Sequence, residues 1–480
     1  MTDSLQNKAV KGVSWSFVET FSLYSVKFII GIVLARLLMP SDFGMLAIMM
    51  VFISISDKLV DAGFGQAYIH KTEVDNRDAN TVFAINFAIS VVLYGLLFAL
   101  APIISEFYDN SSLKLMLRIL SFAIIISSLN VVQNAIVRRN FLFKKRALIS
   151  VSSALLSASV GIGCAYNGYG VWSLIIQQLI EKSLNCILLY LSLNWRLTLS
   201  FSKQSAYSMF NYGTWVLAAN IIAVIFNNIY RLSIGKLFTT SDLGYYERAK
   251  QFENLIADTF TGIVGKVAFP TFSRAQDNKE ELYSLTTNFV KFSSFFVLPL
   301  LGCLCVLASP LIIVVLTDKW ISTVVYLQLL CCVGFFWPFY YFIPPLLQAI
   351  GQTRLCTILT ATLCFLRLLN IAVTYKYGIS AIIIGELCCV ISIIFIAAYL
   401  SKDYLGFNYL TIFRDSLSII MSALGASFLG YLLLHFFMQG VSNYIQLGFG
   451  LMIICFTYFA FVSFFDRDII RKIIKLKELR

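Results

Sequence analysis

The chain has 480 residues, of which 59% are hydrophobic and only 13% charged, and its mean hydropathy is +0.81. Because soluble globular proteins carry about 25% charged residues, this composition excludes an ordinary soluble domain and indicates an integral membrane protein. The formal net charge of +12 could suggest a nucleic-acid partner, but basic residues concentrate at the two termini and in alternate connections. That placement is typical of the cytoplasmic side of a spanning protein, so we expect no nucleic acid.

Apolar runs of about 20 residues, separated by short polar connections, recur from one end of the chain to the other. Each run is long enough to cross a hydrocarbon core about 30 Å thick as an α-helix. The sequence therefore predicts an all-α polytopic membrane protein with about fourteen transmembrane helices. The expected spans are 13–38, 43–64, 79–105, 115–137, 147–166, 169–193, 207–237, 243–270, 284–309, 323–350, 354–376, 379–400, 412–437 and 443–465.

The distribution of basic residues predicts the orientation of these spans. The connection 138–146 alone contains five basic residues, whereas the connections on the opposite side offer only Lys114, Lys319 and Lys376. Both termini should therefore be cytoplasmic, which requires an even number of spans. The polar N-terminus leads directly into the first span without a small-residue cleavage site, so we expect no cleaved signal peptide.

A short segment, Leu34–Gly44, occurs a second time in altered form as Ile234–Gly244. In both copies an apolar run ends with a basic residue, a short turn follows, and Ser-Asp-x-Gly begins the next run. Ser and Asp side chains accept hydrogen bonds from the free amides at a helix start, so both copies predict a helix, a tight turn and a capped second helix.

Further matches extend this duplication over six helices. Ala101–Ile104 corresponds to Ser309–Ile312, and Tyr166–Val171 corresponds to Thr374–Ile379. Because six is an even number, the two copies enter the membrane in the same orientation, and their symmetry axis runs along the membrane normal. The expected parts are an N-terminal six-helix lobe at 1–203, a C-terminal six-helix lobe at 204–404, two additional transmembrane helices at 405–465, and a basic amphipathic tail at 466–480.

Charged residues lie inside several of the expected spans. Segment 243–270 is the most polar of them. One charge near a helix centre costs about 2.5–3.5 kcal/mol on insertion scales, so five charges facing lipid would cost on the order of 10 kcal/mol. This helix must face water or pair its charges internally, and Lys250 is at pairing distance from both Glu247 and Glu253.

Two parallel repeats with charges on their opening helices favour a transporter, whose lobes expose a central cavity alternately to each side. We expect this cavity to be formed by helices 1, 2, 7 and 8. An enzyme is disfavoured because the connections opposite the cytoplasm are a few residues long and neither His70 nor His435 has a ligand partner. We therefore expect no catalytic residue, no metal and no cofactor, and we expect the eleven cysteines to pack in the core. A non-transporting scaffold would leave the buried charges unexplained.

Several motifs resemble a known family. The segments Ala9–Ser16, Leu34–Gly44 and Asp61–Ala67 in the first half, with Gly244–Ala249 and Phe269–Arg274 in the second, closely resemble the polysaccharide-type (Wzx-like) flippases of the MOP exporter superfamily. The resemblance covers helices 1 to 12. It implies a V-shaped protein of two bundles that moves undecaprenyl-diphosphate-linked oligosaccharide from the cytoplasmic to the outer leaflet of the bacterial inner membrane, in lipopolysaccharide or exopolysaccharide biosynthesis. Helices 13 and 14 also resemble that superfamily, where they can form a groove for the lipid tail.

A diphosphate cargo calls for a cationic cavity that is shielded from bulk water. The expected cavity-lining cations are Lys27, Lys58, Arg231, Arg248, Lys250 and Lys266, with Arg36 and Lys236 at the gate or outer mouth. The acids Asp57, Asp61, Glu253 and Asp258 would balance these cations or take up a coupling ion, either a proton or sodium. The alternative that these charges only form internal ion pairs between helices stays open.

The closest rival function is multidrug export by the related MATE branch, which moves organic cations. A cation pump should line its cavity with acids and aromatic residues, whereas helices 1, 2, 7 and 8 supply more bases than acids at depth. That balance favours an anionic cargo. The expected partners are the lipid-linked oligosaccharide, the bilayer, a polysaccharide polymerase and glycosyltransferases.

Overall fold

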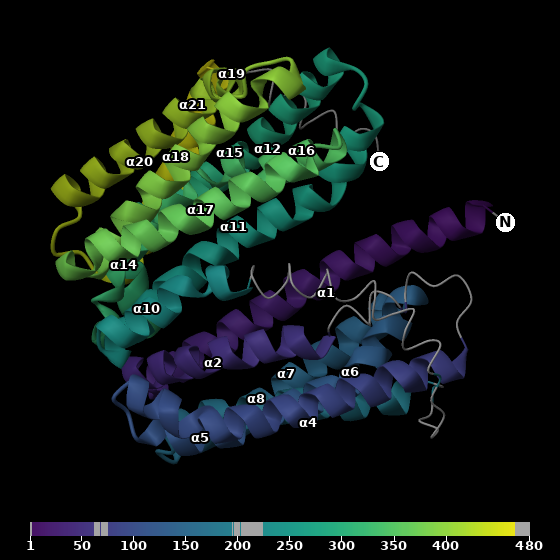
Figure 1. Cartoon of the computed structure of the whole chain (residues 1–480). Coiled ribbons are helices and arrows are strands. Elements are labelled where there is room, and N and C mark those ends of the chain that lie inside the picture. The colour runs from purple at the N-terminus through teal and green to yellow at the C-terminus, as the bar shows by residue number, and fades with distance from the viewer. Residues whose placement is uncertain are drawn as a thin grey trace. The chain divides into compact units, whose positions relative to one another are not determined.

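The computed structural model describes the backbone of residues 2–61, 68, 75–193, 195, 202 and 224–465 (Figure 1). Side chains are described for residues 15, 21–61, 68, 75–193, 195, 202, 224–257 and 267–465. The described residues do not include the predicted tail at 466–480 or positions 207–223 of the span predicted at 207–237. The side chains of Asp258 and Lys266 also lie outside them.

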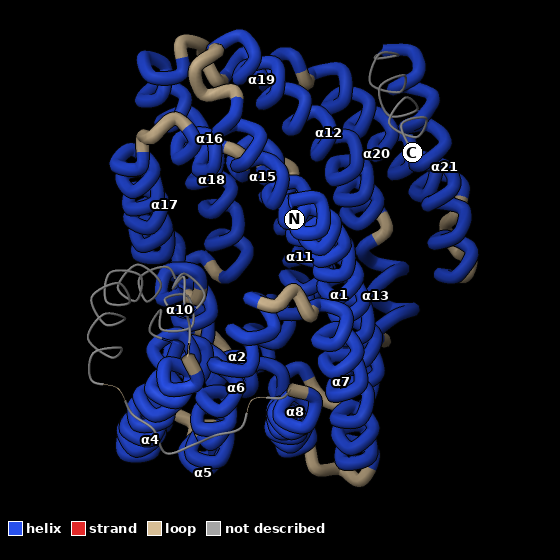
Figure 2. The backbone as a smooth tube through the Cα atoms, turned by 90° about the vertical axis from the view of Figure 1, so that its right-hand side faces the viewer, coloured by secondary structure: helices blue, strands red, loops and turns tan. Residues whose placement is uncertain are grey.

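The part of the chain that the structure describes is built from helices and contains no strand (Figure 2). Ten of its helices are long and apolar enough to cross a membrane, or eleven if one bent pair forms a single span. In addition, α1 (Thr2–Leu37) and α11 (Thr240–Arg274) are 36 and 35 residues long. The all-α membrane fold is confirmed, and the count of fourteen spans stays a prediction.

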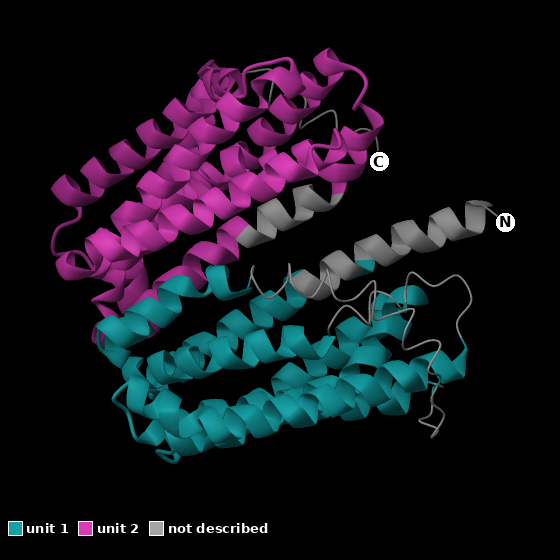
Figure 3. Cartoon of the chain, viewed as in Figure 1, with its two compact units in different colours: residues 1–244 teal, residues 245–480 magenta. Residues whose placement is uncertain are grey.

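The chain divides into two compact units, residues 1–244 and 245–480 (Figure 3). Besides α1 and the first five residues of α11, unit 1 contains α2 (Pro40–Asp61), α4 (Asn76–Phe107), α5 (Ser112–Leu120), α6 (Phe122–Arg139), α7 (Phe143–Tyr166), α8 (Val171–Ser192) and α10 (Ile229–Leu237).

Unit 2 continues α11 and adds the second set of helices. These are α12 (Lys279–Val306), α13 (Ala308–Leu316), α14 (Thr323–Gly334), α15 (Trp337–Tyr341), α16 (Ile343–Ala349), α17 (Thr353–Thr374), α18 (Ile379–Leu405), α19 (Leu410–Asp415), α20 (Leu417–Phe437) and α21 (Asn443–Phe465). The division falls after residue 244 because α10 packs against α2 of the first repeat. The domain boundaries expected at 203 and 404 stay predictions.

Corresponding helices of the two repeats pack on corresponding neighbours. In unit 1, α4 packs on α6, α6 on α8, and α7 on α8. In unit 2, α12 packs on α14, α14 on α18, and α17 on α18. The match of Ala101–Ile104 with Ser309–Ile312 pairs α4 with α12 and α13, and the match of Tyr166–Val171 with Thr374–Ile379 pairs α7 with α17 and α8 with α18. The packing of these helices therefore repeats together with the sequence.

The span expected at 323–350 is broken into α14, α15 and α16, with a bend of 43° after α14. Proline stands in the first turn of both α15 and α16, where its missing amide hydrogen costs nothing but its ring ends the preceding helix. The break leaves Gly334 at the end of α14 and Trp337 at the start of α15. Both residues lie beside a charged pair that is described below.

The two copies of the repeated turn are closed in the same way. Asp42 accepts a hydrogen bond at Oδ2 from the Met39 backbone amide at 2.9 Å, and Asp242 accepts one at Oδ2 from the Thr239 amide at 3.2 Å. Each Asp is the third residue of its helix and accepts from the amide of the residue that precedes the helix, and in the second copy the Asp242 amide also donates to Thr239 Oγ1 at 3.1 Å. The helices begin three residues before the expected spans, at Pro40 instead of 43 and at Thr240 instead of 243.

Within unit 1 the two copies of the turn also contact each other, through their glycines. A Cβ atom added to Gly44 would lie 1.8 Å from the Thr240 carbonyl oxygen, and one added to Gly244 would lie 1.9 Å from the Pro40 carbonyl oxygen. No side chain fits at either place, because the atoms in the way are backbone. The Gly of each Ser-Asp-x-Gly motif is required by this reciprocal contact.

We predict that Gly44→Ala lowers the stability of the protein by about 1–3 kcal/mol, since the methyl group must push two backbone segments apart. Thermal unfolding of the purified full-length protein would measure the effect. Gly95→Ala in α4 is the matched control, because a Cβ there meets nothing within 4 Å and the change improves helix propensity by about 1 kcal/mol. Equal unfolding midpoints for Gly44→Ala and the control would show that the contact is not needed.

Candidate functional site

Unit 1 contains two ion pairs that meet on neighbouring residues of α8. Lys27 Nζ of α1 lies 2.6 Å from Glu181 Oε1, and Lys182 Nζ lies 2.9 Å from Asp57 Oδ2 of α2. Lys182 also donates a hydrogen bond to Ser127 Oγ of α6 at 2.8 Å. Glu181 and Lys182 therefore connect α8 to three other helices by charge-assisted contacts.

These four charged side chains differ in their exposure. The lysines Lys27 and Lys182 are 45% and 23% exposed, and their partners Glu181 and Asp57 are 16% and 34% exposed. Asp57 Oδ1 is buried without a hydrogen-bond partner in the part of the chain that the structure describes. The cluster has no net charge, and its two lysine side chains are partly exposed.

The other charged residues predicted for the cavity or its mouth within residues 1–231 lie outside this cluster. Lys58 and Arg36 are exposed, and Asp61 is half-buried at the end of α2. Arg231 donates a hydrogen bond from Nη1 to Asn228 Oδ1 at 2.9 Å, one turn earlier on the chain. The structure thus brings Lys27 and Asp57 together through α8, and it does not add Lys58, Asp61 or Arg231 to that group.

Lys236, predicted at an outer mouth, belongs to a separate group within unit 1. Its Nζ lies 2.8 Å from Asp109 Oδ2 and 5.0 Å from the centre of the Phe107 ring. The same lysine borders an apolar pocket of about 530 Å³ between α2, the end of α4 and α10. Burial raises the pKa of Tyr108, another lining residue, to about 12, so its hydroxyl stays protonated and contacts the Leu232 carbonyl oxygen at 3.5 Å.

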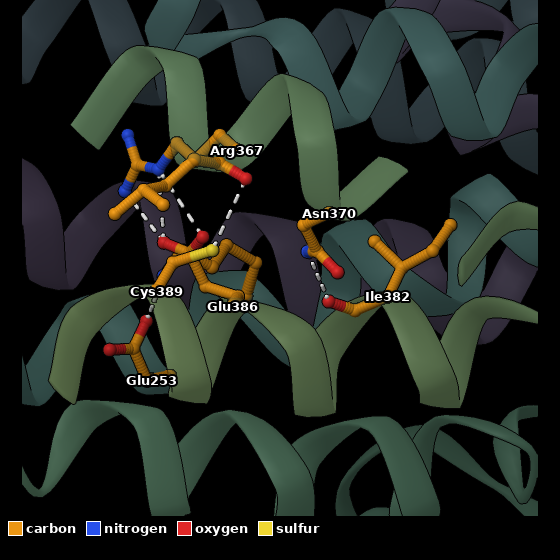
Figure 4. Close-up of polar contacts among 8 residues, drawn as sticks. Glu253, Arg367, Asn370, Ile382, Glu386 and Cys389 are labelled. Atoms are coloured by element: carbon orange, nitrogen blue, oxygen red, sulfur yellow. Dashed lines mark hydrogen bonds and ion pairs between the residues drawn. The ribbon is translucent and has the colours of Figure 1, made fainter. Parts of the chain in front are cut away.

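Unit 2 holds the second charged cluster, on α11, α17 and α18 (Figure 4). Lys250 Nζ lies 2.6 Å from Glu253 Oε2, one turn away on α11, as predicted from the spacing. Arg367 Nη2 of α17 lies 2.6 Å from Glu386 Oε1 of α18, and Arg367 Nε donates to the same carboxylate. Lys250 also interacts electrostatically with Glu386, so the two pairs are neighbours.

Glu253 is the most deeply buried acid of the two clusters. Its side chain is 0% exposed, whereas that of Lys250 is 23% exposed. Glu253 Oε1 has no hydrogen-bond partner among the described residues. It faces Gly334 of α14, where an added Cβ would lie 3.0 Å from it. Trp337 covers the lysine, with its ring centre 5.9 Å from Lys250 Nζ.

Arg248, another cation of α11, is buried on a different side of the helix from Lys250. Its guanidinium lies 5.6 Å from the ring centre of Trp320 and donates a hydrogen bond to Gln251 Oε1. Cation–π contacts of this kind stabilise a guanidinium that has lost its water. Arg248 is thus held by contacts within unit 2 that tie it to the second repeat.

The sequence did not predict four residues of these clusters, which are Glu181, Lys182, Arg367 and Glu386. Each is a charge in the middle of an apolar run, and such a charge inside a span is itself a signal of function or pairing. The sequences of α8, α17 and α18 carry this signal, whereas the predicted site residues came from the helices that open each repeat.

The described residues contain no group of three or more His, Cys, Asp and Glu side chains that could hold a metal ion. The acids found in the two clusters each face a lysine or arginine at hydrogen-bonding distance. An ammonium or guanidinium occupies the position that a bound cation would take. The arrangement therefore offers exchangeable cation–carboxylate pairs, a chemistry suited to an anionic ligand.

Comparison with known proteins supports a role in glycan export. A family model described as polysaccharide biosynthesis protein matches residues 33–325. Lipopolysaccharide biosynthesis protein WzxC of Escherichia coli (strain K12) is 26% identical over 340 residues, which cover 69% of this chain and 68% of that protein. Succinoglycan biosynthesis transport protein ExoT of Rhizobium meliloti (strain 1021) is 23% identical over 493 residues, which cover 100% of this chain and 98% of that protein.

Among solved structures, the lipid II flippase MurJ in an inward closed conformation has a TM-score of 0.76 and 17% sequence identity. The match covers 94% of this chain and 99% of that one. The two proteins share a fold.

We predict that Arg367→Met destabilises the protein by about 3–5 kcal/mol, because it removes the guanidinium that pairs with the buried Glu386 carboxylate. The double variant Arg367→Met with Glu386→Gln should recover much of this loss, since it removes both charges. Thermal unfolding of the purified protein, the two single variants and the double variant measures both effects and the coupling between them. Lys114→Met, at an exposed position of α5, is the control and should unfold like the wild type. Additive effects of the two substitutions would contradict a direct pair.

Proposed function

Because the chain belongs to the family of polysaccharide biosynthesis proteins, whose model matches more than half of it, we propose that it is a lipid-linked oligosaccharide flippase. Its cargo would be an undecaprenyl-diphosphate-linked glycan repeat unit, which it moves from the cytoplasmic to the outer leaflet of the bacterial inner membrane. The family match carries this proposal. ExoT supports it further, because that relative is described as a transport protein and aligns with the whole chain.

The charge pairs within the spans support the same cargo. A polyprenyl diphosphate head group carries two phosphates, which must find cations wherever they leave bulk water. Lys27, Lys182 and Lys250 each have a partly exposed side chain, and the acid beside Lys27 and Lys250 is less exposed than the lysine itself. An anionic cargo can therefore compete with the acid for each lysine, whereas an organic cation would have to displace the lysine itself.

Transport would proceed by alternating access between the two six-helix repeats, with no catalytic step. The reciprocal contact of Gly44 and Gly244 closes backbone on backbone between the two copies of the repeated turn. We infer that this contact separates when the outer side opens, and that Arg36 and Lys236, which flank the turns, lie at that mouth. Both termini are placed on the cytoplasmic side by their basic residues. A polysaccharide polymerase and glycosyltransferases would catalyse the neighbouring steps of the pathway.

MATE-like export of organic cations is the second candidate, because the related MATE branch shares the two-lobe plan. The two functions give opposite results in one experiment. Deleting the gene should make undecaprenyl-linked oligosaccharide accumulate on the cytoplasmic leaflet and should remove the glycan from the cell surface. Unchanged glycan export together with new sensitivity to cationic dyes would favour the MATE-like function instead.

We predict that Lys27→Ala and Lys250→Ala each reduce glycan export by at least about tenfold, which corresponds to about 1.4 kcal/mol of lost stabilisation. Surface glycan in the deletion strain, restored from a plasmid and normalised to the amount of protein in the membrane, is the measurement. Lys114→Ala, an exposed lysine of α5 outside both clusters, is the matched control and should restore export fully. Normal glycan display by both cluster variants would refute the role of these lysines.

A further inference from the structure

We propose that Glu253 takes up a proton when Lys250 exchanges its carboxylate partner for a phosphate of the cargo. The inference rests on the proposed function and deepens it, because it names the ion that accompanies cargo binding and the atom that holds it. Among the charge pairs described in unit 2, the Lys250–Glu253 pair is the one whose exchange requires a proton.

The exposure of the two side chains predicts the order in which an arriving phosphate meets them. Glu253 is 0% exposed and Lys250 is 23% exposed, with 2.6 Å between Nζ and Oε2. The ammonium therefore stands between the buried acid and the surface of the unit. A phosphate arriving from the surface meets the lysine first and never reaches the carboxylate.

In the part of the chain that the structure describes, Lys250 is the residue that binds the Glu253 carboxylate. The other carboxylate oxygen, Oε1, makes no hydrogen bond among these residues. It lies near Gly334, where an added Cβ would be 3.0 Å from Oε1 and 3.0 Å from Leu301 Cδ1. A carboxylate in such surroundings is stable only while its counter-ion stays in place. Loss of Lys250 to a phosphate thus leaves protonation as the way to remove the charge.

The charged and titratable groups around the Lys250–Glu253 pair come from α11 itself and from three further helices. Tyr246 of α11 and Glu386 of α18 interact with Lys250, and Cys331 of α14 interacts with both members of the pair. Cys332 of α14 follows Cys331, and Arg367 of α17 and Cys389 of α18 lie beside Glu386 (Figure 4). Arg367 and Glu386 form a bidentate pair whose charges cancel. Among the described residues Lys250 is the cation that binds Glu253 directly, so the exchange at Lys250 decides the charge state of the acid.

A proton fits this site better than a sodium ion. Hard cations in proteins are bound by about six oxygen ligands, and Glu253 is a single carboxylate next to an ammonium. The described residues hold no group of three or more potential metal ligands. A proton needs one oxygen only, and Oε1 is available to it.

The exchange balances in atoms and charge. Before it, the Glu253 carboxylate and the Lys250 ammonium form a neutral pair, and a phosphate carries one negative charge. One proton from water adds to Glu253 to give the neutral acid, and the ammonium forms its ion pair with the phosphate oxygen. No electron moves and no covalent bond other than the O–H bond forms.

The test uses the full-length protein in lipid nanodiscs and a polyprenyl diphosphate that carries one N-acetylglucosamine as the probe. Both phosphates of this diester stay ionised from about pH 6 to about pH 9, so the protein alone can take up a proton in that range. A pH-indicator dye in weakly buffered solution measures proton uptake on binding, and tryptophan fluorescence measures the dissociation constant. Infrared difference spectra detect the carbonyl band of a newly protonated carboxyl group.

The wild type should take up about one proton for each probe molecule bound. Its dissociation constant for the probe should therefore rise by up to about tenfold for each unit by which the pH is increased. Glu253→Gln should bind at least as tightly, without proton uptake, without the infrared band and without this pH dependence. Glu106→Gln, an exposed acid near the end of α4, should behave like the wild type. Lys250→Met should lose the binding itself.

Two results would overturn the inference while leaving the proposed flippase intact. Binding by the wild type without proton uptake would mean that the lysine bridges acid and phosphate through its three N–H groups. Uptake that persists in Glu253→Gln but disappears in Asp57→Asn would move the proton to unit 1. If Glu253→Gln fails to fold, the wild-type infrared band still decides, since its absence excludes a protonated carboxyl group. No binding of the probe at any pH would refute the proposed cargo and this inference together.

Discussion

A charge inside a membrane span has to be paired, and this constraint organises both units. Water is absent from the hydrocarbon core, so an isolated lysine or arginine there is costly, and removing one member of a buried pair is costly too. The pairs Lys27–Glu181, Lys182–Asp57 and Arg367–Glu386 each join two different helices. The requirement for charge balance therefore fixes which helices are neighbours, in addition to the packing of their apolar faces.

Hydropathy alone predicted the all-α membrane fold because the length and polarity of a span are local properties of the sequence. The Lys250–Glu253 pair was also predictable, since its members are one turn apart on one helix. Lys182 and Asp57, by contrast, are 125 residues apart, and a single sequence carries no rule that joins them. Charges in α8 could have been noticed by their position in an apolar run, but their partners depend on tertiary packing.

The repeated Ser-Asp-x-Gly motif shows the same division between local and distant causes. Its Asp acts locally, and the caps on Met39 and Thr239 follow directly from the spacing. Its Gly acts at a distance, because only the crossing of the two copies requires a residue without a side chain at positions 44 and 244. A duplication that keeps one Gly must keep the other, since either Cβ alone would collide with the backbone of the opposite copy.

The two repeats use one chemistry in unequal surroundings, and this difference gives them different roles. In unit 1 the acids beside the lysines are 16% and 34% exposed, so water can solvate them when a lysine turns to an anionic ligand. In unit 2 Glu253 is 0% exposed and its free oxygen faces apolar atoms. The same exchange of partners therefore needs little beyond solvent in the first repeat and a change of protonation in the second. The two repeats thus differ in function because their acids differ in burial. Desolvation decides whether each acid can stay ionised when its lysine binds another anion.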